Sequence, residues 1–189
     1  MLNNLGCLSA VGVARLLKHD LFENMFLRPG RGTALPLQAP YAPYWSALVF
    51  NRLIGQQASV LNTTVESADE NDRFSNIHAT AFQHNHTLRG LTLLFLNLDD
   101  KLPASVSIPS NFLRGFGGQG NCTSVTLYHL TAAGVASPGG HSMLNAPEIA
   151  LNGVKLEMTA AGELPALKGV VGSCTRPLLL GPLSAMFVQ

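Results

Sequence analysis

Charge is what this sequence has least of. Only 12% of its 189 residues are Asp, Glu, Lys or Arg, and the formal net charge is +1. A charge this small, with no basic run, creates no field that would attract nucleic acid or an anionic membrane surface. The sequence therefore predicts no nucleic-acid partner. It also predicts that much of the surface is uncharged or covered by another body of protein.

Long apolar runs are missing as well. No window approaches the roughly 18 uninterrupted apolar residues of a membrane-spanning helix, so no transmembrane segment is expected. The first 20 residues are mildly apolar, but Asn3 and Asn4 stand where a signal peptide has basic residues, and Arg15 interrupts the apolar run. This pattern favours a helix over a signal peptide.

Cysteine is scarce, and its spacing excludes the common metal and redox motifs. The three cysteines are Cys7, Cys122 and Cys174, and no two form a C-x-x-C pair. They are too few for a disulfide scaffold and have no zinc or thioredoxin-like spacing. One disulfide, between Cys122 and Cys174, is possible if their two segments are neighbours.

No metal or cofactor is expected from the remaining motifs. On one strand, His78 and His84 would share a face but lie about 20 Å apart, too far for one ion. With His86, they fit strand and turn positions instead. Residues 115–120 (GFGGQG) lack the lysine and the strand–helix context of a phosphate-binding loop.

Apolar residues are plentiful, at 47% of the chain, and they change period along it. Residues 1–55 predict two helices, one near residues 3–20 and one over residues 43–55, around a loop rich in Pro and Gly. Pro43 suits the first turn of the second helix, and Gly55 suits the position after its end. Its apolar residues cover more than one face, as in a helix wedged between two bodies of protein: Trp45, Leu48, Val49, Phe50, Leu53 and Ile54.

After residue 57 the pattern alternates with the period of strands. Asn152 and Gly153 predict a type I′ hairpin turn, which requires positive φ at both central residues. Short strands joined by Gly, Pro and Asn turns, with no helices between them, predict a mainly β fold, an antiparallel sandwich of about eight strands. The expected strands are residues 59–66, 77–83, 91–98, 104–108, 124–130, 148–151, 154–158 and 183–188.

The most apolar stretch, GLTLLFLNLDD at residues 90–100, ends in two adjacent carboxylates. Its alternation predicts a central strand buried on both faces. Asp99 and Asp100 follow that strand, and adjacent side chains on an extended chain diverge. A glycosidase pair requires two carboxyls about 5 to 9.5 Å apart facing one bond. We therefore expect these two to be solvated turn residues.

Three N-x-[S/T] sequons, at Asn62, Asn85 and Asn121, would suit a secreted glycoprotein, although chance alone gives a similar number in a chain rich in Asn, Ser and Thr. The sequon at Asn121 has Cys122 as its middle residue. Glycosylation of Asn121 and a disulfide at Cys122 are therefore alternatives that the sequence leaves open.

Five stretches together resemble the carboxy-terminal part of heparanase-like proteins, glycoside hydrolase family 79, with the plant-type members most similar. In order, these are APYWSALVFNRLIG, GLTLLFLNLDD, TLYHLTAAG, ALNGVKLEMTAAGELPAL and PLLLGPLSAMFV, which span residues 42–188. The resemblance implies a two-part enzyme in which a (β/α)8 barrel carries catalysis and a carboxy-terminal β-sandwich packs against it. It implies a retaining endo-β-glucuronidase or β-glucuronidase activity, in which one Glu is the acid/base and another the nucleophile.

The same resemblance places both catalytic glutamates in barrel segments that would precede Met1. Residues 1–57 would be the last βα units of the barrel, and residues 58–189 the sandwich. The helix over residues 43–55 would then face the barrel. In the substrate loop, Phe26 stands where the family has a sugar-contacting Tyr, and Glu23 is the one carboxylate worth testing there. We expect this chain to be a truncated, inactive part of such an enzyme.

The expected partners are the missing barrel segment and, for the complete enzyme, a glucuronic-acid-containing polysaccharide. The resemblance and the sequons suggest an extracellular, secretory or lysosome-like location, with membrane association as in the family. The alternative is a stand-alone carbohydrate-binding or interaction module. Without its barrel, the face of Trp45, Phe50 and Ile54 is expected to be exposed and to cause aggregation or partner-dependence.

Overall fold

The computed structural model describes residues 40, 42–55, 58–67, 76–84, 90–109, 122, 124–133 and 148–189. These residues form one helix and ten strands, and all their strand pairings are antiparallel. The described part of the chain is therefore mainly β, as predicted. The helix expected near residues 3–20 lies outside it.

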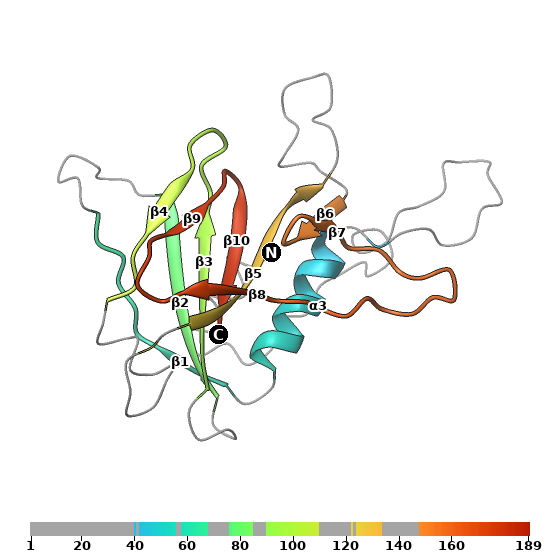
Figure 1. Ribbon diagram of the computed structural model, residues 1–189, viewed down its shortest axis with the longest axis horizontal. Coiled ribbons are helices and arrows are strands. Elements are labelled where there is room, and N and C mark those ends of the chain that lie inside the picture. Colours follow the sequence, from blue (N-terminus) through green and yellow to red (C-terminus); the bar gives the residue numbers. More distant parts are fainter. Residues whose placement is uncertain are drawn as a thin grey trace.

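The elements are α3 (Ala42–Ile54), β1 (Ala58–Leu61), β2 (Ile77–His84), β3 (Gly90–Asn97), β4 (Ala104–Val106), β5 (Ser124–Ala133), β6 (Glu148–Leu151), β7 (Val154–Lys155), β8 (Val170–Ser173), β9 (Leu178–Leu180) and β10 (Ser184–Val188). Eight strands form the main sheet, in the order β1-β2-β3-β10-β5-β6-β7, with β8 also paired to β5, while β4 and β9 form a second sheet (Figure 1). The carboxy-terminal strand β10 therefore lies in the middle of the main sheet.

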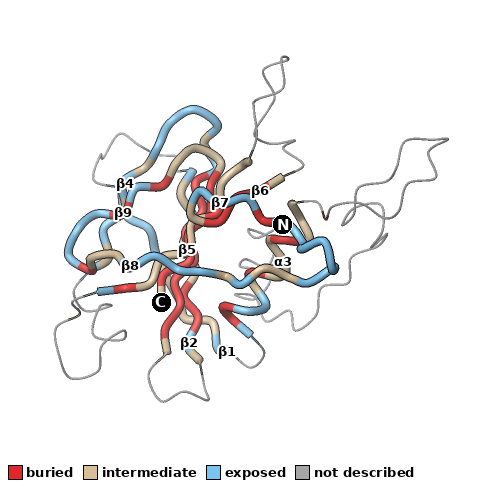
Figure 2. The backbone as a smooth tube through the Cα atoms, turned by 45° about the vertical axis from the view of Figure 1, so that its right-hand side comes forward, coloured by how far each residue is buried: buried red, intermediate tan, exposed pale blue. Residues whose placement is uncertain are grey.

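The central strand β3 is buried on both faces, as its sequence predicts. Seven of its eight residues are buried. Leu94 and Leu96 belong to one apolar cluster, and Leu93 and Phe95 to the other. The exception to the prediction is Leu98, which is 41% exposed because the strand ends at Asn97. Figure 2 shows the buried residues concentrated in the central strands.

Each face of the main sheet is covered by a different element. On one face α3 packs against the sheet in a cluster that includes Trp45, Phe82 and Phe187. On the other face, Leu178 and Leu180 of β9 pack over β3 and β10. The two clusters alternate along the strands, because successive side chains point to opposite faces.

The helix α3 has the ends that its sequence predicts, and it packs against the sheet of its own chain. Pro43 lies in its first turn, and Gly55 follows its last residue with φ of 71°. Trp45 and Ile54 are only 1% and 4% exposed, and Phe50 lies edge-on to Phe82, with ring centroids 5.5 Å apart. The expectation that Trp45, Phe50 and Ile54 would form an exposed face is wrong, because they pack against the sheet of the same chain.

The remaining members of the helix's apolar set also belong to this cluster. Val49 and Leu53 are buried in it, and Leu48 is partly buried against it. A sheet with large side chains on both faces gives the apolar stripe of α3 a surface within its own chain. That α3 belongs to a barrel stays a prediction.

The hairpin at Asn152 and Gly153 is confirmed. Their φ angles are 50° and 79°, both positive as a type I′ turn requires, and Leu151 pairs with Val154 across the turn. The following strand is shorter than predicted: β7 ends at Lys155, and residues 156–159 have no strand pairing.

The sequence prediction of eight strands missed β8 and β9. Strand β8 contains Gly172, a residue depleted in strands. Strand β9 consists of three leucines, Leu178 and Leu180 buried and Leu179 exposed, so its alternation is invisible in the sequence. Both are short, and their pairing partners lie far away in the chain, on β5 and β4.

Candidate functional site

Asp99 is a turn residue held by hydrogen bonds, as the sequence predicts. Its Oδ1 accepts hydrogen bonds from the backbone N–H groups of Lys101 and Leu102, both at 2.8 Å. Its Oδ2 accepts one from Asn76 Nδ2 at 3.2 Å. The neighbouring Asp100 is exposed. Asp99 therefore organises the loop between β3 and β4, and both of its oxygens already have partners.

These hydrogen bonds predict a pH dependence of stability. The N–H groups of Leu102 and Lys101 hold the pKa of Asp99 below its ordinary value of 3.8. The unfolded chain therefore binds the proton first as the pH falls. We expect the stabilisation by Asp99 to be complete above about pH 4 and to be lost below it, as the pH falls through the lowered pKa of the folded state.

This dependence is measurable as the urea midpoint of unfolding between pH 6 and pH 2.5. Asp99→Asn is a matched control, because its amide oxygen can accept the same two backbone hydrogen bonds without titrating. The midpoint of the wild type should fall more than that of the variant on acidification. Parallel curves for the two proteins would contradict the role assigned to Asp99.

Two other carboxylates come together at the β6–β7 hairpin, with a lysine between them. Lys155 Nζ lies 2.8 Å from Glu148 Oε1 and 3.7 Å from Glu157 Oε2. The hydrogen bond to Glu148 raises the pKa of Lys155, so its ammonium group stays charged. The ammonium group of the lysine thus bridges the two carboxylates. We therefore interpret this cluster as an exposed ion-pair network that supports the hairpin.

The histidines of the sheet lie in structural positions. His84 Nε2 lies 2.7 Å from the hydroxyl of Thr92, a residue that is fully buried. Burial of His129 lowers its pKa and so favours the neutral ring. Within the described residues, no three His, Cys, Asp or Glu side chains gather into a group that could hold a metal ion.

Thr92 also connects the sheet to α3 through the last residue of the chain. Gln189 Nε2 donates to Thr92 Oγ1 at 3.0 Å and to the carbonyl of Leu53 at 2.8 Å. Leu53 lies in the last turn of α3, where carbonyl groups have no partner within the helix. This partly buried contact fixes the carboxy-terminal end of α3 on the sheet.

Asn152 is a structural residue that sequence reasoning recognised only as a turn former. Its side chain fills the gap on one edge of β5 between β8 and β6. Its Oδ1 accepts a hydrogen bond from the N–H of His129 at 2.8 Å, and its Nδ2 donates to the carbonyls of Leu127 and Lys168, both at 3.0 Å. The positive φ already explains an Asn here, so the sequence carries no separate signal for these contacts.

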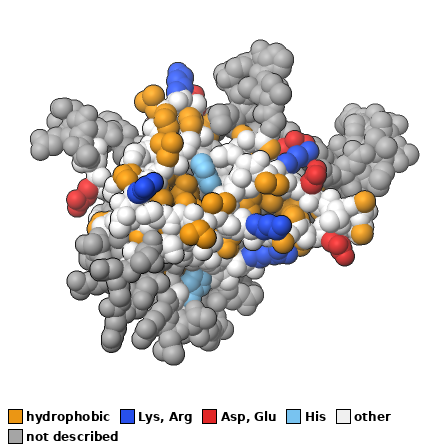
Figure 3. All heavy atoms as spheres, in the orientation of Figure 1, with side chains coloured by type: hydrophobic (Ala, Val, Ile, Leu, Met, Phe, Trp, Pro, Cys, Tyr) orange, Lys and Arg blue, Asp and Glu red, His pale blue; other side chains and the backbone are white. Residues whose placement is uncertain are grey.

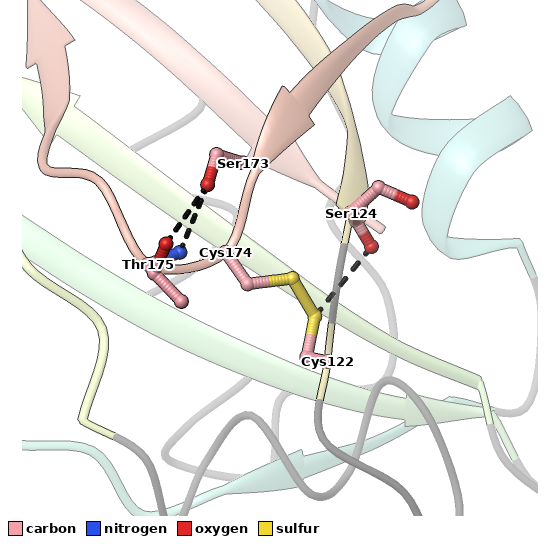
Figure 4. Close-up of a disulfide and its surroundings, with 5 residues drawn as sticks. All are labelled: Cys122, Ser124, Ser173, Cys174 and Thr175. Carbon is pink, nitrogen blue, oxygen red and sulfur yellow. Dashed lines mark hydrogen bonds between the residues drawn. A yellow bond between two sulfur atoms is a disulfide. The ribbon is translucent and has the colours of Figure 1, made fainter.

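Only some of the other predicted site residues lie in the part of the chain that the structure describes. Asn62 is exposed just after β1, at the position of a sequon. The structure joins Cys122 to Cys174 by a disulfide (Figure 4). The remaining predicted positions lie outside the described residues: Glu23, Phe26, Asn85 and Asn121.

Comparison with known proteins shows that the chain is similar in sequence to two plant proteins. Heparanase-like protein 3 of Arabidopsis thaliana is 26% identical over 167 residues, which cover 79% of this chain and 28% of that protein. Baicalin-beta-D-glucuronidase of Scutellaria baicalensis is 27% identical over 191 residues, which cover 100% of this chain and 32% of that protein. The chain is related to both at the family level. No protein-family model matches it.

This heparanase-like relation extends over a limited part of each relative. The chain spans about a third or less of the length of the two proteins it matches. The relation agrees with the resemblance seen in the sequence and supports a connection to glycoside hydrolases. Among the described residues, no helix is both long and apolar enough to cross a membrane.

Proposed function

We propose that this chain forms the non-catalytic β-sandwich part of a heparanase-like glycoside hydrolase of family 79. In such an enzyme a (β/α)8 barrel carries both catalytic glutamates and acts as a retaining endo-β-glucuronidase or β-glucuronidase on glucuronic-acid-containing glycans. The chain by itself then has no hydrolytic activity. Its role is to complete the fold of the enzyme and to support the barrel.

The observation that carries this proposal is the placement of the described carboxylates. A retaining glycosidase uses two carboxyl groups about 5 Å apart on either side of one glycosidic bond. Asp99 is bound within a turn, and the pair Glu148 and Glu157 is separated by the ammonium group of Lys155. Neither arrangement leaves two carboxyls free to face a sugar. The family-level relation supports the same assignment.

The proposal includes the partner and the location of the chain. The partner is the barrel segment, and the location is extracellular or within the secretory pathway. In that location Asn62 would carry a glycan. Asn62 is exposed, and so is Thr64, the third residue of its sequon. Exposure of both is what glycosylation of this site requires.

Incubation of the purified chain with p-nitrophenyl β-D-glucuronide tests the proposal. We expect no release of p-nitrophenol above the buffer blank, because a catalytic pair is needed both to form and to hydrolyse the glycosyl-enzyme intermediate. The Glu23→Gln variant is the matched control and should give the same blank value. Turnover by the wild type that Glu23→Gln abolishes would overturn the proposal.

A titration with glucuronide oligosaccharides distinguishes the alternative reading. Saturable binding without hydrolysis would identify a carbohydrate-binding module in place of an enzyme part. We expect no saturable binding by the chain alone, because none of the exposed large apolar side chains among its described residues is aromatic and the net charge is only +1.

A further inference from the structure

The disulfide lies at one end of the ladder that joins β8 to β5. Ser124 and Ser173 are the terminal pair of this ladder, with Cys122 two residues before the start of β5 and Cys174 directly after the end of β8. The two cysteine Cα atoms are 6.0 Å apart, although the residues are separated by 52 positions in the sequence. The bond therefore fastens the carboxy-terminal end of β8 to the sheet (Figure 4).

Apart from this bond, the described part of the chain holds β8 by one strand pairing. The strand pairs with β5 over four residues and with no other described strand. Its two valines, Val170 and Val171, are 53% and 77% exposed, so burying them contributes little to its docking. Figure 3 shows apolar side chains open to solvent on the face of the molecule seen in Figure 1.

The backbone of β8 must also approach β5 closely. A Cβ atom built at Gly172 would lie 2.5 Å from Leu127 Cδ1, closer than real Cβ contacts allow. The strand therefore presents a glycine to Leu127, and this position adds no side-chain packing of its own. Among the described residues, β8 is held by a short backbone ladder, by the side chain of Leu127 packed against Gly172, and by a covalent bond at one end.

The rest of β5 is held independently of β8. Residues 127–130 pair with β10 on the opposite edge, and residues 130–133 pair with β6. Phe187 and Val188 of β10 are fully buried. On the amino-terminal side of β8, Asn152 Nδ2 holds the carbonyl of Lys168, and on the other side the buried Leu178 begins β9. The segment that can separate is thus bounded at both ends.

We propose that the Cys122–Cys174 disulfide is a redox clasp, and that its reduction releases β8 from β5 while the rest of the main sheet stays folded. The released segment is residues 169–177, between the two anchors at Lys168 and Leu178. Release uncovers the backbone groups of β5 that face β8. An uncovered edge of this kind is a template for a strand of another chain.

The reductant is a dithiol, and the reaction is a two-electron exchange. Cys122 is partly buried and Cys174 is buried, at 5% exposed, so the reductant's thiolate attacks Cys122 Sγ. Cys174 leaves as a thiolate and takes up a proton, and the second thiol of the reductant displaces Cys122 and forms a cyclic disulfide. Cys122 Sγ lies 3.5 Å from the carbonyl oxygen of Ser124, which can accept a hydrogen bond from the new thiol.

Hydrogen exchange measured by mass spectrometry, with and without dithiothreitol, tests the clasp in the intact chain. We expect the amides of residues 170–173 to exchange about tenfold faster or more after reduction, while peptides from β3 and β10 keep their protection. Reoxidation should restore the slow exchange. A Cys7→Ser background prevents the third thiol from exchanging with the disulfide.

Three results decide the matter. Unchanged protection of residues 170–173 after reduction overturns the proposal, because β8 would then dock without the bond. Loss of protection throughout the main sheet also overturns it, since the disulfide would then stabilise the whole fold and not β8 alone. The double variant Cys122→Ser with Cys174→Ser should exchange fast at residues 170–173 with or without reductant, and a reductant response in that variant would contradict the assignment.

Discussion

Trp45→Ala is expected to lower the free energy of unfolding by about 3–5 kcal/mol, as large-to-small changes at buried aromatic positions do. Trp45 is 1% exposed and lies in the cluster that α3 forms with the main sheet. Its indole N–H donates to the carbonyl of Pro40 at 3.1 Å, so the substitution also leaves a buried carbonyl without its partner. The loss combines a cavity with an unmade hydrogen bond.

Urea unfolding followed by circular dichroism measures this change. The matched control is Asn51→Ala, an exposed position on the same helix, which should change the free energy of unfolding by no more than about 0.5 kcal/mol. A loss below about 1 kcal/mol at Trp45 would mean that α3 is not part of the cooperative unit. It would also favour the prediction that this side of α3 packs against another body of protein.

Asn152→Asp is expected to lower the free energy of unfolding by about 2–4 kcal/mol. The substitution keeps the shape of the side chain and tolerates the positive φ of 50°. It removes the amide group that donates to the carbonyls of Leu127 and Lys168. It also puts a carboxylate beside those two carbonyl oxygens, which repel it. The effect thus reports the side-chain hydrogen bonds and not the turn.

The same unfolding measurement, with Val154→Ala as the control in the same hairpin, tests this role. Val154 is 70% exposed, and its truncation should be nearly neutral. Asn152→Gly, which retains the turn geometry but has no side chain, should resemble Asn152→Asp in direction. Near-neutral behaviour of both variants would show that the turn alone explains the asparagine.

Local signals in the sequence predicted the elements that depend on local physics. The alternation of residues 91–97 gave the buried strand β3, since a run of large apolar residues must be covered on both faces. Pro43 and Gly55 marked the two ends of α3. Asn152 and Gly153 gave the hairpin through their tolerance of positive φ. In each case the signal lies within a few residues of the element.

The sequence did not predict features that depend on residues far away in the chain. Strand β8 pairs with β5 and is joined to Cys122 by the disulfide, and both partners lie about 50 residues earlier in the chain. The surface against which Trp45 packs includes Phe82 and Phe187, which belong to the sheet of the same chain. An apolar stripe states only that a surface must be covered, and tertiary packing decides which surface covers it.

The candidate site follows the same division. By itself the sequence determined the mainly β class, the central strand, the hairpin and the solvated position of Asp99 and Asp100, because alternation and turn chemistry act between near neighbours. Only the tertiary structure decided that Lys155 separates Glu148 from Glu157, that Asn152 fills the edge of β5, and that Cys122 meets Cys174. These contacts join distant segments, and strand order and register, which bring such segments together, are properties of the folded sheet.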